Sequence, residues 1–366
     1  MKVLTIGSAT IDTIAIIDST RIERMTMRNA DSSFLLLEEG RKTEAEEVST
    51  HTGTHTGGGA VNAAVAMARL GMDVMILAKI GNDERGEMIL QRLEQEGVST
   101  SLVKRDPHAP TGTSVLISSH DRDAAIFTFR GANTLLKPED LQDEAFDADL
   151  IYVANLSNES ADCFPLIVDR AKKHNALVAA NPGPRQLSAR GETFLKCLAP
   201  IDILILNHTE ADLLVPKLIP RWGEGGPTLS VAPGEEVPSL AARRLSSGGY
   251  EMSVAGVLRA LTQLGPMHVI ITDGARGAFV GSRDEIIFGS AQKSKVFGTA
   301  GAGDAFGATF AAYLAQGHRI DEALIAASIN SASVVQYVDT QTGLLRRQHL
   351  DEKVASGYQA IKRWPI

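Results

Sequence analysis

The sequence predicts a single α/β domain with a doubly wound, mainly parallel sheet, helices on both faces of that sheet and a small β lid. Short apolar runs alternate with helical patterns along the chain, as in a parallel sheet that is covered on both faces. Two β-rich segments interrupt this alternation. Runs of small residues also lead directly into two of the helical patterns. We assign the whole chain, residues 1–366, to this one domain.

The main body of the domain is defined by apolar strand candidates and by the helical patterns between them. The strand candidates are residues 3–6, 74–78, 150–153, 177–180, 203–206 and 268–272. The helical patterns cover residues 60–70, 84–93, 304–315 and 321–337. Because most of these strands are apolar throughout, we expect them inside a parallel sheet.

The lid is expected to form from two segments that lie far apart in the chain, at about 13–56 and 109–130. Both segments hold β-rich runs in a polar context. The strand candidates in and beside them are residues 11–17, 34–37, 46–48, 113–119 and 125–129. Residues 216–250 contain five prolines and six glycines without a sustained period, which indicates a loop insertion outside the core.

Composition and charge favour a small-molecule substrate. Apolar residues make up 44% of the chain and charged residues 22%, the balance of an ordinary globular enzyme. The net charge of −8, without any Lys/Arg-rich run, argues against nucleic acid and anionic membranes as partners. Two cysteines without a CxxC motif argue against a disulfide framework or a zinc site and fit the reducing cytoplasm. No run of eighteen apolar residues occurs, so no membrane helix is expected.

The most specific motif is the run of small residues at 298–307, which reads GTAGAGDAFG and opens directly into a helical pattern. Backbone N–H groups in such a run can approach an anion closely, and a helix N-terminus adds partial positive charge. The amides of Gly301, Ala302 and Gly303 could hold a phosphoryl group, while Asp304 accepts the proton of the attacking hydroxyl. The run matches neither the P-loop nor the GxGxxG pattern. A tight turn followed by a capped helix would explain the same residues.

A second run of small residues, Gly57-Gly58-Gly59, leads into another helical pattern and places Asn62 one turn inside it. Glycines leave room for a ligand at a helix start, and the amide of Asn62 can bond to neighbouring hydroxyls. Close packing of the helix start against the sheet is the alternative. Asp12 is a carboxylate in an otherwise apolar strand, which favours a ligand-binding role over a turn at the strand end.

Further candidates lie where strands end. Asn207 and Glu210 follow the strand at 203–206, at the edge where α/β proteins bind ligands, and Glu210 could hold Mg²⁺ through water. The same spacing of Asn and Glu is also that of a capping box. Arg130 ends a lid strand, where it could meet the negative charge of a substrate or simply be solvated.

One more turn could admit a nucleotide. Thr272 ends the strand at 268–272, and Gly274 and Gly277 follow it closely. Glycines leave space for a ligand in such a turn, but a plain hairpin would need them as well.

In their order along the chain these elements resemble the ribokinase-like (PfkB) family of carbohydrate kinases. The resemblance extends over nearly the whole sequence, and its most specific parts are the glycine pair before Asn62 and the GAGD run that ends at Asp304. It implies the ribokinase-like fold.

The resemblance also implies a role for each matching residue. Asp304 takes the place of the catalytic base. The anion hole beside it is formed by Gly301, Ala302 and Gly303. The residues implied to bind sugar hydroxyls are Asp12, Gly57, Gly58 and Asn62. Asn207 and Glu210 would organise Mg²⁺ and phosphate. The residues implied to hold ATP are Thr272, Gly274, Gly277 and Asn330. The lid strands resemble a substrate cover that often forms a dimer interface.

The sequence departs from the family pattern before the GAGD run. Many members carry a carboxylate where this chain has Gly298, and that carboxylate helps to bind a monovalent cation in those relatives. We therefore expect little dependence on a monovalent cation. Gly59 stands where ribokinases often have lysine.

The resulting expectation is an ATP- and Mg²⁺-dependent kinase that acts on a sugar or sugar acid in the cytoplasm, as a possible homodimer through the lid. Arg130 favours an acidic or phosphorylated sugar. Two alternatives stay open at this point: a nucleoside kinase of the adenosine kinase type, and a catalytically silent sugar-binding regulator. The intact GAGD run argues against the second, because a silent protein has no need of Asp304.

Overall fold

The computed structural model describes residues 1–17, 22–27, 30–35, 49–119, 124–231, 236–356 and 361–365. Its central sheet has nine strands in the order β19-β18-β17-β16-β13-β12-β11-β1-β6. These strands are β1 (Lys2–Ile6), β6 (Asp73–Leu77), β11 (Leu150–Val153), β12 (Leu177–Ala180), β13 (Ile203–Asn207), β16 (His268–Thr272), β17 (Ala278–Gly281), β18 (Glu285–Gly289) and β19 (Lys362–Pro365). The pairs from β6 to β16 are parallel, and β17, β18 and β19 add an antiparallel edge. The predicted mainly parallel sheet is confirmed.

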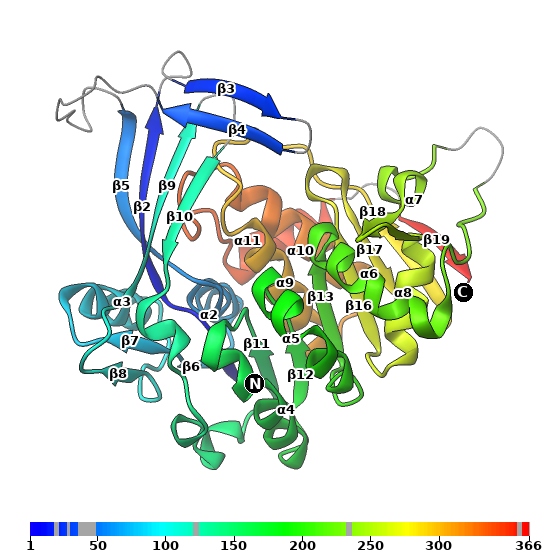
Figure 1. The fold of residues 1–366 in the computed structure, drawn as a ribbon. Coiled ribbons are helices and arrows are strands. Elements are labelled where there is room, and N and C mark those ends of the chain that lie inside the picture. The colour runs from blue at the N-terminus through cyan, green and yellow to red at the C-terminus, as the bar shows by residue number, and fades with distance from the viewer. Residues whose placement is uncertain are drawn as a thin grey trace.

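Helices cover both faces of this sheet (Figure 1). One core contains side chains of α4 (Phe164–Lys173), α5 (Pro184–Lys196), α6 (His208–Trp222) and α8 (Val254–Gln263). The other contains side chains of α2 (Gly59–Arg69), α3 (Glu84–Gln95), α9 (Ala302–Ala315), α10 (Ile320–Val334) and α11 (Arg347–Ala355). Within β13, Leu204 packs into the first core, and Ile203 and Ile205 pack into the second. This alternation explains why the strand is apolar throughout.

A second sheet stands away from the main body (Figure 1). Its order is β10-β9-β2-β5, formed by β10 (Ala124–Phe129), β9 (Gly112–Ser119), β2 (Thr10–Ile17) and β5 (Ser49–Gly57). β2 pairs with β9 in parallel and with β5 in the antiparallel sense, so both sequence segments predicted for the lid contribute strands. A separate hairpin consists of β3 (Ile22–Met27) and β4 (Ala30–Leu35). The strand candidate at 46–48 and residues 36–37 lie outside the described residues.

The expectation of a loop throughout 216–250 is wrong. Helix α6 continues to Trp222 across Pro216 and Pro220. Leu214 and Leu218 are fully buried on this helix, and their packing outweighs the disruption by the prolines. Further along lie α7 (Ser239–Arg243) and a hairpin of β14 (Leu245–Ser247) and β15 (Tyr250–Met252). Residues 232–235 are outside the described part of the chain.

Short elements complete the fold. They are β7 (Lys79–Gly81), β8 (Lys104–Asp106) and the 3₁₀ turns η2 (Gly131–Thr134), η3 (Pro138–Asp140), η4 (Asp143–Phe146), η5 (Asn158–Cys163) and η6 (Gly274–Arg276). None of the helices in the described ranges combines the length and the apolar character needed to cross a membrane.

Candidate active site

The GAGD run forms the start of α9. Gly301 precedes the helix with φ 77°, a left-handed conformation that favours glycine. A Cβ atom at this position would lie 2.6 Å from the Cβ of Thr340, so close packing also excludes a side chain. A Cβ at Gly303 would meet nothing within 4 Å, so open space lies beside the first turn. The first N–H groups of a helix have no acceptor within it, so the start of α9 can hold an anion.

Asp304 lies in this first turn and is partly buried. Its Oδ2 accepts a hydrogen bond of 2.8 Å from Nδ2 of Asn62 on α2. Burial raises the pKa of Asp304, the hydrogen bond from Asn62 works against this rise, and the negative charge of Asp12 adds to it. A carboxyl with a raised pKa is a better proton acceptor when it is ionised, which is what a general base requires.

Both the nitrogen and the oxygen of the Asn62 side-chain amide form hydrogen bonds within the protein. While its nitrogen donates to Asp304, its Oδ1 accepts from Oγ1 of Thr340 at 2.9 Å and from Nε2 of Gln341 at 3.2 Å. Asn62 is buried, with 3% of its surface exposed. The structure thus places Asn62 beside the predicted base, with its oxygen already bonded within the protein.

Asp12 lies against the backbone at Gly57. Its Oδ1 accepts from Oγ of Ser114 at 2.6 Å and from Oγ1 of Thr10 at 2.9 Å. A Cβ atom at Gly57 would lie only 1.9 Å from Oδ2 of Asp12, so position 57 must lack a side chain. Burial raises the pKa of Asp12 against the opposing effect of the bonds from Ser114 and Thr10.

Ser8 joins the end of β1 to the start of α2. Its Oγ accepts from the amide of Gly59 at 3.1 Å and donates to Oδ1 of Asn155 at 2.9 Å. Gly58 has φ 97°, and a Cβ there would lie 2.5 Å from the carbonyl oxygen of Ser8. A Cβ at Gly59 would lie 3.2 Å from Oδ1 of Asn155 and 3.5 Å from Oδ1 of Asp304. The glycines therefore bring these polar groups together.

Asn207 and Glu210 form a reciprocal capping box at the start of α6. Oδ1 of Asn207 accepts from the amide of Glu210 at 2.8 Å, and Oε2 of Glu210 accepts from the amide of Asn207 at 2.9 Å. Burial raises the pKa of Glu210 to about 7, the backbone bond from Asn207 opposes this, and the charge of Asp304 adds to it.

The negative charge at Glu210 would favour a cation beside this residue. The negative charge of Asp304 disfavours the ionised form of Glu210, and a divalent cation would relieve that repulsion. Mg²⁺ keeps several waters and binds phosphate oxygens, so it needs few protein ligands. Among the described residues, no group of three or more His, Cys, Asp or Glu side chains is placed to hold a metal ion.

The turn after β16 is held by ion pairs. Asp273 is buried, and Arg276 binds it with Nε and Nη2 at 2.7 and 2.6 Å. Burial raises the pKa of Asp273, but the hydrogen bonds and the positive charge of Arg276 lower it by more. The pKa of Asp273 is therefore lowered overall. Gly274 has φ 57°, and a Cβ at Gly277 would lie 2.2 Å from the carbonyl oxygen of Gly289. The hairpin therefore requires both glycines, while Thr272 ends β16 partly exposed.

Asn330 lies in the interior rather than at the site. Its side chain is fully buried, its Nδ2 donates to Oγ1 of Thr309 at 2.8 Å, and its Oδ1 accepts from the amide of Leu345 at 2.9 Å. This amide ties α10 to α9 and to the chain before α11. The expected contact between the Asn330 side chain and ATP does not fit this placement.

Arg130 follows β10 and is half-buried. Burial lowers the pKa of its guanidinium, and the positive charge of Arg185 at the start of α5 lowers it further. Within the described ranges, no carboxylate acts on the guanidinium of Arg130. Two like charges therefore lie near each other, and Arg130 has no neutralising partner in this part of the chain.

Several residues of the site were missed by the sequence analysis as functional groups. Thr340 and Gln341 contact Asn62 from a loop after α10, and Ser8 and Asn155 meet at the ends of β1 and β11. Polar residues at the carboxyl ends of neighbouring parallel strands are a signal that could have identified Ser8 and Asn155. Nothing in the sequence pattern around Thr340 or Gln341 separates them from an ordinary loop.

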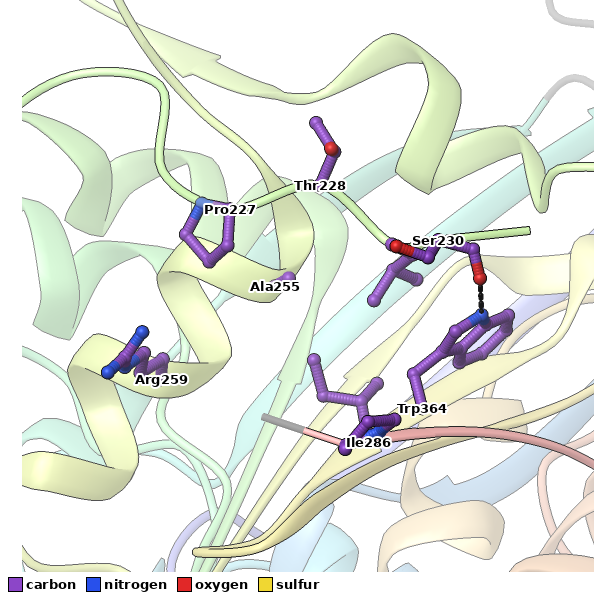
Figure 2. A pocket seen from close by; sticks show the side chains of 9 residues that line it. Pro227, Thr228, Ser230, Ala255, Arg259, Ile286 and Trp364 are labelled. Carbon is purple, nitrogen blue, oxygen red and sulfur yellow. Dashed lines mark hydrogen bonds between the residues drawn. The ribbon is translucent and has the colours of Figure 1, made fainter.

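A small cavity of about 110 Å³ near the C-terminus lies apart from this site (Figure 2). Ala255 of α8, Ile286 of β18 and Trp364 of β19 line it, and Nε1 of Trp364 donates to the carbonyl oxygen of Ser230 at 2.8 Å. Ile286 and Trp364 belong to the core on the face of the sheet opposite to α9. None of the predicted site residues lines this cavity.

Comparison with known proteins agrees with the motifs. The profile of the pfkB family carbohydrate kinases matches residues 13–347. The chain is 26% identical over 330 residues to a deoxyribokinase of Salmonella typhi, a match that covers 90% of this chain and 94% of that protein. It is 27% identical over 329 residues to a ribokinase of Bacillus subtilis, covering 88% and 96% of the two chains.

Solved structures share the fold. A ribokinase from Thermotoga maritima superposes with a TM-score of 0.69 at 19% identity, covering 96% of this chain and 99% of that one. An adenosine kinase from Sinorhizobium meliloti gives a TM-score of 0.71 at 19% identity, covering 96% and 98%. Since the family profile extends over most of the sequence and the fold agrees, this chain belongs to the PfkB family of carbohydrate kinases.

Proposed function

We propose that this kinase transfers the γ-phosphate of ATP to a hydroxyl of a small sugar or sugar acid, with Asp304 as the general base. The observation that carries the proposal is the position of Asp304, in the open first turn of α9 and bonded to Asn62. There the carboxylate can take the hydroxyl proton while the amides of Gly301, Ala302 and Gly303 stabilise the charge of the transferred group.

The acceptor would bind between the lid and the start of α2. Asp12 and the glycine pair Gly57 and Gly58 line this side, and Oδ2 of Asp12 faces the backbone at Gly57. The amide nitrogen of Asn62 adds a donor beside Asp304. Hydrogen bonds to vicinal hydroxyls from such groups would orient the reacting hydroxyl toward the base.

ATP and Mg²⁺ would bind along the carboxyl edge of the sheet. Glu210 and Asn207 would hold Mg²⁺ through water, and the ion would supply charge stabilisation to the phosphates. The nucleotide would lie against the turn formed by Thr272, Gly274 and Gly277. The ion pair of Asp273 with Arg276 keeps that turn in place.

Arg130 and Arg185 favour an acidic acceptor within this class. They are positively charged and lie near each other, and no carboxylate in the described ranges acts on Arg130. A carboxylate or phosphate remote from the reacting hydroxyl would neutralise them. The names of the relatives make ribose and deoxyribose the neutral acceptors to compare.

The test is ADP release with MgATP across neutral sugars, sugar phosphates, keto-deoxy acids and nucleosides. We expect release with a sugar or sugar acid, and a preference for acids would support the role of Arg130. A preference for nucleosides would assign the chain to the other kinase class. Binding of a sugar without any ADP release would indicate a regulator rather than an enzyme.

A homodimer through the lid is part of the proposal. Val115, Phe127 and Phe129 lie on one face of the lid sheet and are exposed, Phe127 with 65% and Phe129 with 58% of their surface. Exposed aromatic side chains gathered on one face are typical of an interaction surface. In light scattering, the wild type should be a dimer, and the double variant with Phe127→Ser and Phe129→Ser should be a monomer.

A further inference from the structure

The side-chain amide of Asn62 contacts Asp304 through its nitrogen. The orientation of this amide determines whether a donor or an acceptor lies against the carboxylate. Nδ2 donates to Oδ2 of Asp304 at 2.8 Å. An amide has donors at one end and an acceptor at the other. Half a turn of the group would place Oδ1 of Asn62 against the carboxylate, where two acceptors repel each other. The groups that hold Oδ1 therefore control this contact.

Two donors hold the oxygen of Asn62 away from Asp304. Oγ1 of Thr340 donates to it at 2.9 Å, and Nε2 of Gln341 donates to it at 3.2 Å. All three side chains are buried. In a buried site each of these polar groups needs its partner, so the arrangement excludes the rotated amide as long as both donors point inward.

Gln341 itself could face either way, and Arg92 of α3 determines which together with Thr56. The backbone oxygen of Thr56 accepts from Nε2 of Gln341 at 3.0 Å, and Oγ1 of Thr56 donates to Oε1 of Gln341 at 3.2 Å. Nε of Arg92 donates to Oε1 of Gln341 at 3.1 Å, and a guanidinium has no acceptor. The oxygen of Gln341 therefore faces the donors of Arg92 and Thr56, which leaves its nitrogen for Asn62 and for the carbonyl oxygen of Thr56. Arg92 is held in turn by Glu96, whose Oε1 lies 2.8 Å from Nη2 of Arg92.

We propose that Arg92, Gln341 and Thr340 are positioning residues that fix the amide of Asn62 and so hold its nitrogen against the base Asp304. The chain of bonds runs in one direction, from Arg92 through Gln341 and Asn62 to Asp304. It begins at the wall of a polar cavity of about 380 Å³, which Arg92 and Gln341 line together with Thr56. The inference rests on the proposed role of Asp304 as general base.

The charged and titratable groups around Asp304 determine how its pKa responds when the bond from Asn62 is lost. Asp12 of the lid, Glu210 of α6 and Tyr152 of β11 interact electrostatically with it. Asp12 and burial raise the pKa of Asp304, and only the bond from Asn62 acts in the opposite direction. Loss of that bond must raise the pKa, so that a larger share of the base is protonated and inactive near neutral pH.

The decisive measurement is the pH dependence of kcat in Gln341→Met and Arg92→Met, with the most active acceptor found in the panel. We expect kcat near neutral pH to fall about tenfold, since a hydrogen bond to a charged group contributes a factor of about ten or more. The acidic limb should move to higher pH, while KM for MgATP stays within about twofold of wild type. Arg92→Lys keeps a donor without an acceptor and should recover part of kcat.

Matched variants separate orientation from packing. Gln91→Met makes the same substitution on the wall of the same cavity, outside the chain of bonds, and should keep the wild-type pH profile. Thr340→Val should shift the acidic limb, whereas Thr340→Ser, which keeps the hydroxyl, should restore it. Carbon-13 NMR titration of the aspartate carboxyls, with Asp304 identified from Asp304→Asn, gives the same comparison without a substrate.

The proposed function and the positioning role can be disproved separately. If Asp304→Asn keeps wild-type turnover, or if no acceptor is phosphorylated, the proposed function is wrong. If Asp304→Asn is inactive but Gln341→Met, Arg92→Met and Thr340→Val leave both the pH profile and the Asp304 titration unchanged, the positioning role is overturned. An equal loss at every pH in folded variants would also overturn it, because that result indicates misplacement without a change in the pKa of the base.

Discussion

Helices α6 and α9 present their first turns to the same site, but they begin in opposite ways. Asn207 and Glu210 cap α6 reciprocally, so side chains of the helix itself use its first amides. Gly301 caps α9 without any side-chain bond, in a left-handed conformation beside Thr340. The start of α9 therefore has no side-chain cap, whereas two amides at the start of α6 are already bonded to side chains.

The difference divides the chemistry between the two helices. An uncapped N-terminus suits a phosphoryl group, and α9 adds the carboxylate of Asp304 within the same turn. The capped start of α6 has two of its amides already bonded and presents a buried carboxylate with a raised pKa, which suits a cation. We infer that the anion and the cation of the reaction are held by different helices.

Asp304→Asn should have the largest effect on this arrangement. The amide matches the carboxylate in size but cannot accept the hydroxyl proton, so turnover should fall about 10²- to 10⁴-fold. Nucleotide binding should remain, because the backbone amides of α9 are unchanged. The measurement is kcat at saturating substrates together with ATP affinity by calorimetry. A variant within a few-fold of wild-type turnover would disprove the role of Asp304.

Gly301→Ala should have the next largest effect, because it disturbs the open start of α9. The left-handed conformation and the contact with Thr340 both oppose a side chain at Gly301, whereas Gly303 has open space around its Cβ position. Such strain costs about 1 to 3 kcal/mol, so ATP affinity should weaken about tenfold or more.

Substitutions at Gly303 provide the comparison. Gly303→Ala should fold normally, and Gly303→Val should lose ATP affinity only because its branched side chain occupies the space left for phosphate. Calorimetric titration with ATP checks all three variants. Equal ATP affinity for wild type, Gly301→Ala and Gly303→Val would mean that the nucleotide phosphates bind elsewhere.

Glu210→Gln tests the capped helix. Glutamine retains an acceptor for the amide of Asn207, so the helix start should persist without the negative charge. The pKa of Glu210 is raised to about 7 in the folded protein, so its contribution to stability is lost as pH rises from its ordinary pKa of 4.5 through about 7. Without magnesium, the wild-type Tm should fall over this range more than that of Glu210→Gln.

Differential scanning calorimetry at about pH 5 and about pH 8, with and without Mg²⁺, provides the measurement. Magnesium should recover more stability at the higher pH in the wild type than in the variant. If both proteins respond identically to pH and to Mg²⁺, Glu210 neither titrates in this range nor faces the ion.

Patterns that are local in the chain allowed the sheet to be predicted, and they led to the proposal of Asp304 as the base. The apolar strands and the GAGD run need only neighbouring residues to be recognised, and Asp12 and Gly57 could be paired through the family resemblance. The structure confirms the fold and brings Asp12 against Gly57. The helical part of 216–250 was missed because the prolines of α6 disguise a helix that burial stabilises.

The support of the base could not be predicted, for a physical reason. Asn62 and Gln341 are 279 residues apart, and their contact depends on the packing of α2 against the loop after α10. A hydrogen bond between two amides leaves no periodic or compositional trace in the sequence. Asn330 shows the converse, because the resemblance implied a ligand contact where the structure uses its amide to join two helices.

The smallest effect is expected from monovalent cations, and Gly298 is the reason. A Cβ atom at this position would lie 3.1 Å from the carbonyl oxygen of Tyr337 and 3.2 Å from that of Val338, so a carboxylate here would stand beside two carbonyl oxygens. Glycine contributes no side-chain oxygen at this position. Asp339 follows in the same loop, but its Oδ1 accepts from the amides of Gln341 and Thr342 at 2.9 and 2.7 Å, so this oxygen is bonded within its own turn.

A cation prefers anionic oxygen when water competes for it. Turnover at fixed ionic strength should therefore be nearly equal in potassium, sodium and a bulky organic cation, since screening depends on ionic strength and not on the ion. Activation of several-fold by potassium alone would show that the carbonyl oxygens suffice, and that the loop before α9 is organised by an ion as well as by Thr340.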